Sequence, residues 1–343
     1  MSLEVFLDDT PGEVRGVIVR DGRFEHLLIQ REDDVAEHRL GARCIGRIAE
    51  VHPGLKGAFV DLGTALQGFL PFRGQDRLAA GQKVEVEVSA EPREGKGPTL
   101  RLIGAGVGAP RLLRPGPTVA ETLAALAPGV EAVTGLAGIQ ASRSAEEEAG
   151  LPCELFPDTG LDLMIQRTRA LIAVDLDLAP APGVAFGAPA RTRANRQGLH
   201  MAARMIRLRR WGGLVAVDLI GTGLDGDAVM TAARQAFGGD PDVVFGPVNR
   251  FGVLQLAVPW RRTPLEEILN GRDRSRRPEQ RAQDIARSLR FALLSDTKSP
   301  RITARAATVD AALAGPLVAR LGPRAHLKCD PAMAPGAFLL EDQ

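Results

Sequence analysis

Two apolar segments that each end in aspartate constrain the fold of this chain more than any other feature. The first, ALIAVDLDLAP, runs from Ala170 to Pro180, and the second, GGLVAVDLIG, contains Asp218. Each is typical of a buried strand, and Asp218 follows Asp175 by 43 residues, which leaves room for a helix between them. A strand, a crossover helix and a second parallel strand are characteristic of α/β proteins. We therefore expect the two segments to lie side by side in one sheet.

The aspartates of these segments predict a metal site. Side chains alternate between the faces of a strand, so Asp175 and Asp177 point the same way, near the strand's carboxyl end. Ligands of open α/β sheets bind at that end, and carboxylates there suit a hard cation. We predict that Asp175, Asp177 and Asp218 bind Mg²⁺, with Mn²⁺ as the alternative, and that Asp175 and Asp218 are catalytic. The structural alternative is that each is only a helix cap or turn residue.

The segment between the two strands is strongly basic. Residues 190–210, ARTRANRQGLHMAARMIRLRR, include seven arginines and no acidic residue. A solvated helix face usually mixes in glutamate, because oppositely charged pairs four residues apart stabilise helices. The segment therefore favours contacts with the phosphates of a polyanion. The net charge of the whole chain, +1, adds no support for a nucleic-acid partner.

The first hundred residues are typical of short strands. Residues 1–40 predict a three-stranded meander, and residues 41–103 predict five strands separated by Gly and Pro, for which a small OB-fold barrel is the candidate. Aromatic residues make up only 4% of the chain, and OB folds stack unpaired bases on aromatic rings beside basic side chains. Phe59 and Phe69 of this segment are therefore candidates for base stacking. The alternative is that both rings belong to the core of the barrel. The predicted RNA contacts are Lys56, Phe59, Phe69, Lys96, Arg191, Arg193, Arg204, Arg207 and Arg250.

A competing motif is GTGLDG, from Gly221 to Gly226, a formal G-x-G-x-x-G match before a predicted helix. A dinucleotide site needs an acidic residue at the end of the next strand, about 20 residues later. That strand ends in FGPVN, without an acid. A nicotinamide-dependent oxidoreductase is therefore the third alternative.

Several features bound the location of the protein. The three cysteines form no C-x-x-C pair, so we expect neither a zinc site nor a disulfide framework, as suits a cytoplasmic protein. The N-terminus lacks the pattern of a signal peptide. No apolar run approaches the roughly 20 residues that span a bilayer, so no membrane association is expected.

Four segments together resemble the bacterial ribonuclease E/G endoribonucleases. AFVDLGTALQGFLPF is similar to the family's S-one-type RNA-binding OB fold, and TRALIAVDLDLA to its strand ending in Asp-Val-Asn. NRQGLHMAARMIRLRRWGGLVAVDLI resembles the helix and strand with the second catalytic aspartate, and NRFGVLQL the strand after it. The resemblance covers nearly the whole chain and implies an α+β multidomain protein. Its implied parts are an OB-fold domain (41–104) inserted in a split RNase H-like subdomain (1–40 and 110–157), a DNase I-like α/β catalytic subdomain (158–265) and a small α/β C-terminal domain (278–343).

The resemblance also implies an activity, which is Mg²⁺-dependent hydrolysis of single-stranded RNA to 5′-phosphate and 3′-hydroxyl ends. The metal-binding positions match Asp175 and Asp218. The chain departs from the family at Asp177, where the family has Asn, and at Gly221 and Gln255, where it has Asp and Glu. The 5′-end sensor and the zinc-link cysteines are also missing, so we expect no zinc-linked dimer. A catalytically impaired RNA-binding protein of the same fold is the second alternative.

Overall fold

The computed structural model describes residues 2–72, 78–179, 187–271 and 273–342, which form a mixed α/β structure with seven α-helices. The chain divides into two compact units. Unit one consists of Met1–Ala145 and Arg262–Gln343, and unit two of Glu146–Arg261. Within the described ranges, no helix is both long and apolar enough to cross a membrane. The finer division into four domains stays a prediction.

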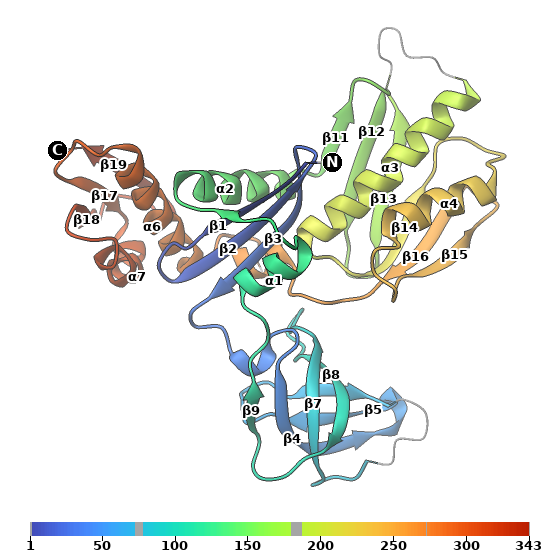
Figure 1. Cartoon of the computed structure of the whole chain (residues 1–343), viewed down its shortest axis with the longest axis horizontal. Helices are drawn as coiled ribbons and strands as arrows, with labels where there is room; N and C mark the ends of the chain where they lie inside the picture. The colour runs from blue at the N-terminus through green and yellow to red at the C-terminus, as the bar shows by residue number, and fades with distance from the viewer. Residues whose placement is uncertain (1, 73–77, 180–186, 272, 343) are drawn as a thin grey trace. The chain divides into compact units, whose positions relative to one another are not determined.

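Unit two is a six-stranded mixed sheet with two helices on one face (Figure 1). The helices are α3 (Ala188–Arg209) and α4 (Gly226–Phe237). In sheet order the strands are β11 (Cys153–Phe156), β12 (Leu161–Arg167), β13 (Ile172–Leu178), β14 (Gly213–Asp218), β16 (Val253–Val258) and β15 (Val244–Val248). Strands β13 and β14 are parallel neighbours, and the other pairs are antiparallel. The predicted parallel pair is confirmed.

The alternating sequence of β13 explains how the sheet is covered. Ile172, Val174 and Leu176 are buried on the face toward the helices, whereas Asp175 and Asp177 are exposed on the opposite face. Small residues of α3 allow the close approach. A Cβ on Gly198 would lie 2.6 Å from both Cδ atoms of Leu176, so a larger residue here would force the buried Leu176 side chain to shift. The apolar packing of one face therefore leaves the carboxylates on the other.

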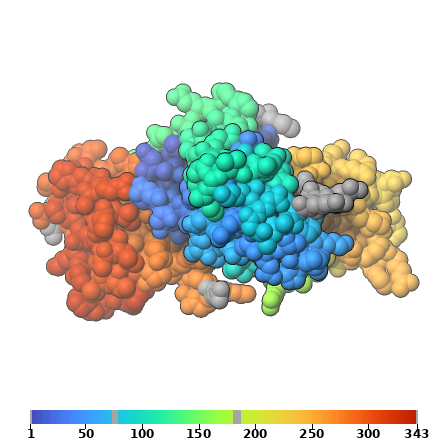
Figure 2. Space-filling view, turned by 90° about the horizontal axis from the view of Figure 1, so that it is seen from below, coloured from blue at the N-terminus to red at the C-terminus, as the bar shows by residue number. Residues whose placement is uncertain are grey.

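Unit one contains a closed five-stranded barrel that is compatible with an OB-like fold. Its strands, in order around the barrel, are β4 (Arg43–His52), β5 (Gly57–Asp61), β6 (Gly68–Pro71), β8 (Thr99–Ala105) and β7 (Lys83–Ala90), which pairs with β4 again. An additional strand, β9 (Arg111–Arg114), also pairs with β4. Side chains such as Val60, Leu70, Val86 and Leu100 fill the interior. In Figure 2 the blue and cyan atoms of the barrel form one continuous packed body.

The rest of unit one is built on two small sheets. The predicted meander is confirmed as β1 (Leu3–Asp8), β2 (Glu13–Arg20) and β3 (Arg23–Arg31), with β10 (Ala132–Val133) parallel to β1. Helix α1 (Val119–Leu126) packs on β2 and β3, and α2 (Leu136–Gly150) contacts β1 through the hydrogen bond from Ser142 to Asp8. The C-terminal elements are α5 (Leu265–Leu269), α6 (Pro278–Ser295), β17 (Ile302–Ala306), α7 (Thr308–Ala319), β18 (Ala325–Cys329) and β19 (Phe338–Asp342).

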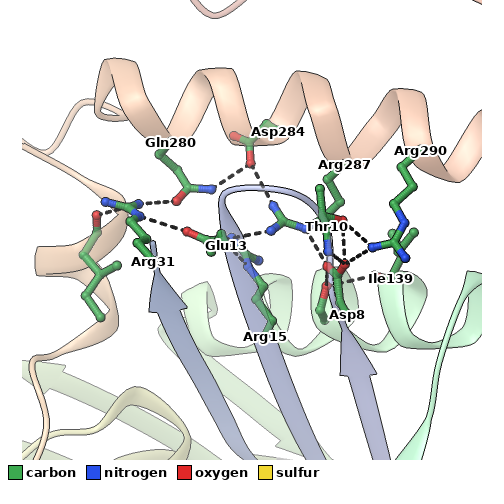
Figure 3. Close-up of polar contacts among 12 residues, drawn as sticks. Asp8, Thr10, Glu13, Arg15, Arg31, Ile139, Gln280, Asp284, Arg287 and Arg290 are labelled. Carbon is green, nitrogen blue, oxygen red and sulfur yellow. Dashed lines mark hydrogen bonds and ion pairs between the residues drawn. The ribbon is translucent and has the colours of Figure 1, made fainter. Parts of the chain in front are cut away.

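A buried ionic network joins the meander to α6 (Figure 3). Arg287 donates from Nε to Asp8 Oδ2 at 2.7 Å and from Nη2 to Glu13 Oε1 at 2.8 Å. Glu13 also accepts hydrogen bonds from Arg15 and Arg31. Burial alone would raise the pKa of Glu13, but the charges of Arg15, Arg287 and Arg31 outweigh burial and lower it. The carboxylates of Asp8 and Glu13 are therefore ionised, and their ion pairs with the arginines stabilise unit one.

Candidate metal and RNA site

Asp175 and Asp218 lie on neighbouring parallel strands of unit two. Their Cα atoms are register partners in the pairing of β13 with β14. Both side chains are exposed, and the alternation of each strand puts them on the same face of the sheet. Asp218 is the last residue of β14, so the pair is at the carboxyl end, as the sequence predicts. Strand pairing has therefore brought together two carboxylates that are 43 residues apart.

Asp175 and Asp218 carry like charges that the strand pairing holds close together. Partial burial and the negative charges of Asp218, Asp177 and Asp162 raise the pKa of Asp175 above its ordinary value. Among the described residues, neither Asp175 nor Asp218 has a hydrogen-bond or ion-pair partner. The described residues therefore leave this repulsion unrelieved. A bound cation would relieve it.

Two further aspartates lie on the same face. Asp177 is exposed, and its Oδ1 accepts a hydrogen bond from the backbone of Leu178 at 2.7 Å. Its register partner across the β12–β13 pair is Asp162, which was not among the predicted site residues. The alternating segment LDLMIQR could have placed Asp162 on this face, but the antiparallel register that sets it opposite Asp177 was not predicted.

The donor set fits a hard divalent cation. Mg²⁺ is usually bound through one or two carboxylates together with water and substrate phosphates, and the pair of Asp175 and Asp218 is compatible with that mode of binding. Within the described ranges, no three His, Cys, Asp or Glu side chains gather closely enough to form a closed metal cage. The role of Asp177 as a third ligand therefore stays a prediction.

Asn195 of α3 forms hydrogen bonds with the loop that follows β14. This side chain is 3% exposed and forms two hydrogen bonds with the backbone of Ile220. Its Oδ1 accepts from Ile220 N at 2.8 Å, and its Nδ2 donates to Ile220 O at 3.1 Å. Ile220 is two residues beyond Asp218, so Asn195 fixes the point where the strand ends. A single buried amide inside a basic segment gave no signal of this role in the sequence.

Arg191 lies across the same loop. A Cβ on Gly221 would be 3.0 Å from both Cδ and Nε of Arg191, and Gly221 has a φ of +94°. Gly221 stands where the resembled family has an aspartate. Here the space beside it is taken by an arginine side chain, which adds a cationic group close to the carboxyl end of β14.

The arginines of α3 divide into two groups. Arg193 is exposed and Arg191 partly exposed, in the first turns of the helix. Arg204 is 1% exposed and pairs with Glu148 and Glu154, so its predicted contact with RNA does not fit its position. Arg207 is partly buried and donates to the backbone of Ala236 at 3.2 Å. The sequence showed the charge of this segment but not which arginines the fold would use internally.

The predicted contacts on the barrel lie outside its core. Phe59 and Phe69 are cross-strand partners, both partly exposed, with ring centroids 5.5 Å apart in an edge-to-face arrangement. Lys56 is exposed and directly precedes β5. Lys96 has a 73% exposed side chain in the β7–β8 connection, 3.9 Å from Glu94. An aromatic pair with a neighbouring lysine on a barrel surface is suited to unpaired bases.

The GTGLDG segment forms the connection from β14 to α4. The carboxylate of Asp225 caps α4 by accepting from the backbone of Asp227 and Ala228, at 3.1 and 3.2 Å. It therefore occupies the amides that a pyrophosphate would use. Strand β15 does not pair with β14, since β16 lies between them. Both features disfavour a dinucleotide site.

The last predicted contact, Arg250, is exposed in the connection between β15 and β16, where its guanidinium carbon lies 4.8 Å from the ring centroid of Phe251.

Comparison of the chain with models of protein families and with curated proteins finds no match in either.

Proposed function

We propose that the protein is an endoribonuclease that hydrolyses single-stranded RNA with the help of Mg²⁺ or Mn²⁺ held by Asp175 and Asp218. The observation that carries the proposal is the register pairing of these two exposed carboxylates, together with the raised pKa of Asp175. A structural aspartate is normally neutralised by a partner, whereas these two are not neutralised by any described residue. Perturbed carboxylates of this kind are typical of functional sites.

The chain's own residues have separate tasks in this proposal. Asp175 and Asp218 bind the cation, and Asn195 holds the strand end that carries Asp218. Arg191 and Arg193 bind the phosphate backbone. When bound, the cation supplies a polarised water and neutralises charge on the phosphoryl oxygens.

The barrel would contribute RNA binding without sequence preference. Phe59 and Phe69 would stack unpaired bases, with Lys56 and Lys96 against the backbone. This assignment corresponds to the resembled ribonuclease E/G family, with an S-one-type OB barrel, an RNase H-like part and a DNase I-like catalytic part. A cytoplasmic location fits three free cysteines, of which Cys153 and Cys329 are exposed.

The test is cleavage of a labelled, A/U-rich single-stranded RNA by the wild type and by Asp218→Asn. We expect Mg²⁺-dependent cleavage by the wild type and a loss of roughly 1,000-fold in the variant, because several kcal/mol of charge stabilisation disappear. Asp227→Asn is the matched control, since Asp227 is exposed in the same unit but lies in the first turn of α4. Equal cleavage by the wild type and Asp218→Asn would contradict the assignment of Asp218 to the active site of an endoribonuclease.

A second candidate is an RNA-binding protein that has lost catalysis. Gln255, an exposed neutral residue, is the register partner of Ala216 on the carboxylate face, and Gly221 lacks a side chain. Each stands where the resembled family has an acidic residue. This candidate predicts RNA binding with a steep salt dependence, unchanged in Asp218→Asn, and no Mg²⁺-dependent cleavage.

A further inference from the structure

The hairpin between β15 and β16 has a braced tip. Asn249 Oδ1 accepts hydrogen bonds from Phe251 N at 2.9 Å and from Val253 N at 3.0 Å. Gly252 N donates to Asn249 O at 3.1 Å, and Gly252 has a φ of +84°, which favours glycine. The tip therefore presents its side chains from a defined backbone.

Phe251 is exposed at this tip. Its side chain is 70% exposed, and within the described ranges it is the one aromatic residue among the exposed large apolar side chains. Arg250 lies against it, with its guanidinium carbon 4.8 Å from the ring centroid. An apolar ring this exposed contributes little to the core, and the stacked arginine adds a positive charge beside it.

The tip adjoins the carboxylate pair. Asp218 is the register partner of Val253, the first residue of β16. Leu219 N donates to Gly252 O at 3.2 Å, so the chain directly after Asp218 is hydrogen-bonded to the residue after Phe251. The aromatic–arginine pair and the predicted metal site are therefore neighbours within one sheet.

We infer that Phe251 and Arg250 hold the unpaired nucleobase next to the phosphodiester that is cut, with the base on the ring and Arg250 on an adjoining phosphate. The inference rests on the proposed function. A planar base matches the open area of the Phe251 ring, and the guanidinium matches phosphate charge. Because every base has a π-face, the pair requires the presence of a base and does not select its identity.

The first test measures binding of a fluorescein-labelled ten-nucleotide oligouridylate in the Asp218→Asn background, so that the RNA stays intact. We expect Phe251→Ala to weaken binding by roughly 10- to 100-fold, the range for loss of one base–aromatic stack. Phe251→Trp should bind within about 2-fold of the parent, because it keeps a stacking surface. Leu155→Ala is the matched control, since Leu155 is 56% exposed in the same unit, and it should leave binding unchanged.

The second test scans one abasic nucleotide through a short RNA and measures cleavage with Mg²⁺. The wild type should slow by a similar factor only when the abasic site adjoins the scissile bond, and Phe251→Ala should not respond at that position. Equal binding by Phe251→Ala and its parent overturns the inference, while wild-type cleavage preserves the proposed function. Binding that depends on Phe251 without wild-type cleavage overturns the proposed function and, with it, the placement of the base beside a cut bond. A wild type that neither binds nor cleaves RNA overturns both.

Discussion

Aspartates at strand ends have opposite surroundings in the two units. In unit one, Asp8 ends β1, is 1% exposed, and is neutralised by Arg287. In unit two, Asp218 ends β14 and is exposed beside Asp175 with no neutralising partner among the described residues. Burial opposes the ionisation of Asp8, but Arg287 and Thr10 outweigh it and lower its pKa, whereas the pKa of Asp175 is raised.

We propose that this difference in surroundings separates structural carboxylates from functional ones. A strand-end aspartate that arginines neutralise contributes to folding, since its charge is already compensated. A pair of carboxylates that no described residue compensates costs stability, and in the proposed function a cation would offset that cost. The motif alone does not distinguish the two cases, because both aspartates follow an apolar strand.

The largest expected effect is in unit one. Arg287→Met should destabilise the protein by about 3–5 kcal/mol, because it leaves the buried carboxylates of Asp8 and Glu13 undercompensated. Urea unfolding measures the change. Arg101→Met is the control, since Arg101 is 46% exposed in its pair with Glu87, and it should cost less than about 1 kcal/mol. Similar effects from the two substitutions would contradict the structural role of the network.

Acidic pH should also weaken unit one. The pKa values of Asp8 and Glu13 are lowered by folding, so their contribution is complete above the unfolded pKa and is lost as the pH falls below it. We expect the urea midpoint to decrease from about pH 5 to about pH 2. In Glu13→Gln the protein should be less stable at neutral pH and its midpoint less dependent on pH. An unchanged pH dependence in this variant would show that Glu13 is not neutralised as described.

A smaller effect is expected behind Asp218. Asn195→Ala removes both hydrogen bonds to Ile220 and leaves buried backbone groups unpaired, at a cost of about 2 kcal/mol. If Asn195 positions the strand end, RNA cleavage should need more Mg²⁺ for half-maximal rate. An Mg²⁺ dependence identical to that of the wild type would reduce Asn195 to a purely structural residue.

The smallest expected effect is the loss of stability that the repulsion between Asp175 and Asp218 causes. At neutral pH in the absence of divalent cations, Asp218→Asn should stabilise the protein by on the order of 0.5 kcal/mol, because it relieves repulsion of Asp175. The raised pKa of Asp175 means that the repulsion is present only above that pKa, so the gain should vanish below about pH 4. Thermal unfolding at both pH values measures it. A loss of stability at neutral pH would mean that Asp218 has a structural partner.

The sequence predicted the features that depend on local pattern. Alternation of apolar residues placed Asp175 and Asp177 on one face, and the helical crossover predicted the parallel pairing with β14. The barrel strands were also expected from their turns and spacing, and the five-stranded barrel was found. Helix α3 begins at Ala188, ahead of the basic segment that starts at residue 190, and Pro189 in its first turn is compatible with a helix start.

Features that depend on packing between distant segments could not be predicted. Charge alone did not show that Arg204 would be buried against Glu148 and Glu154, since those partners are 56 and 50 residues away. The same holds for Asp162, whose place depends on the register of the β12–β13 pair. Periodicity shows which face a side chain lies on, but only the three-dimensional packing shows what it meets there.

Mn²⁺ binding, monitored by electron paramagnetic resonance in the absence of RNA, tests most directly whether Asp175 and Asp218 form a metal site. Titration of the wild type, Asp175→Asn, Asp218→Asn and the control Asp227→Asn would compare their affinities for the ion. We expect one site in the wild type and in Asp227→Asn, and a loss of at least about 10-fold in affinity in each of the other two variants. Equal Mn²⁺ affinity in all four proteins would contradict a metal site formed by Asp175 and Asp218.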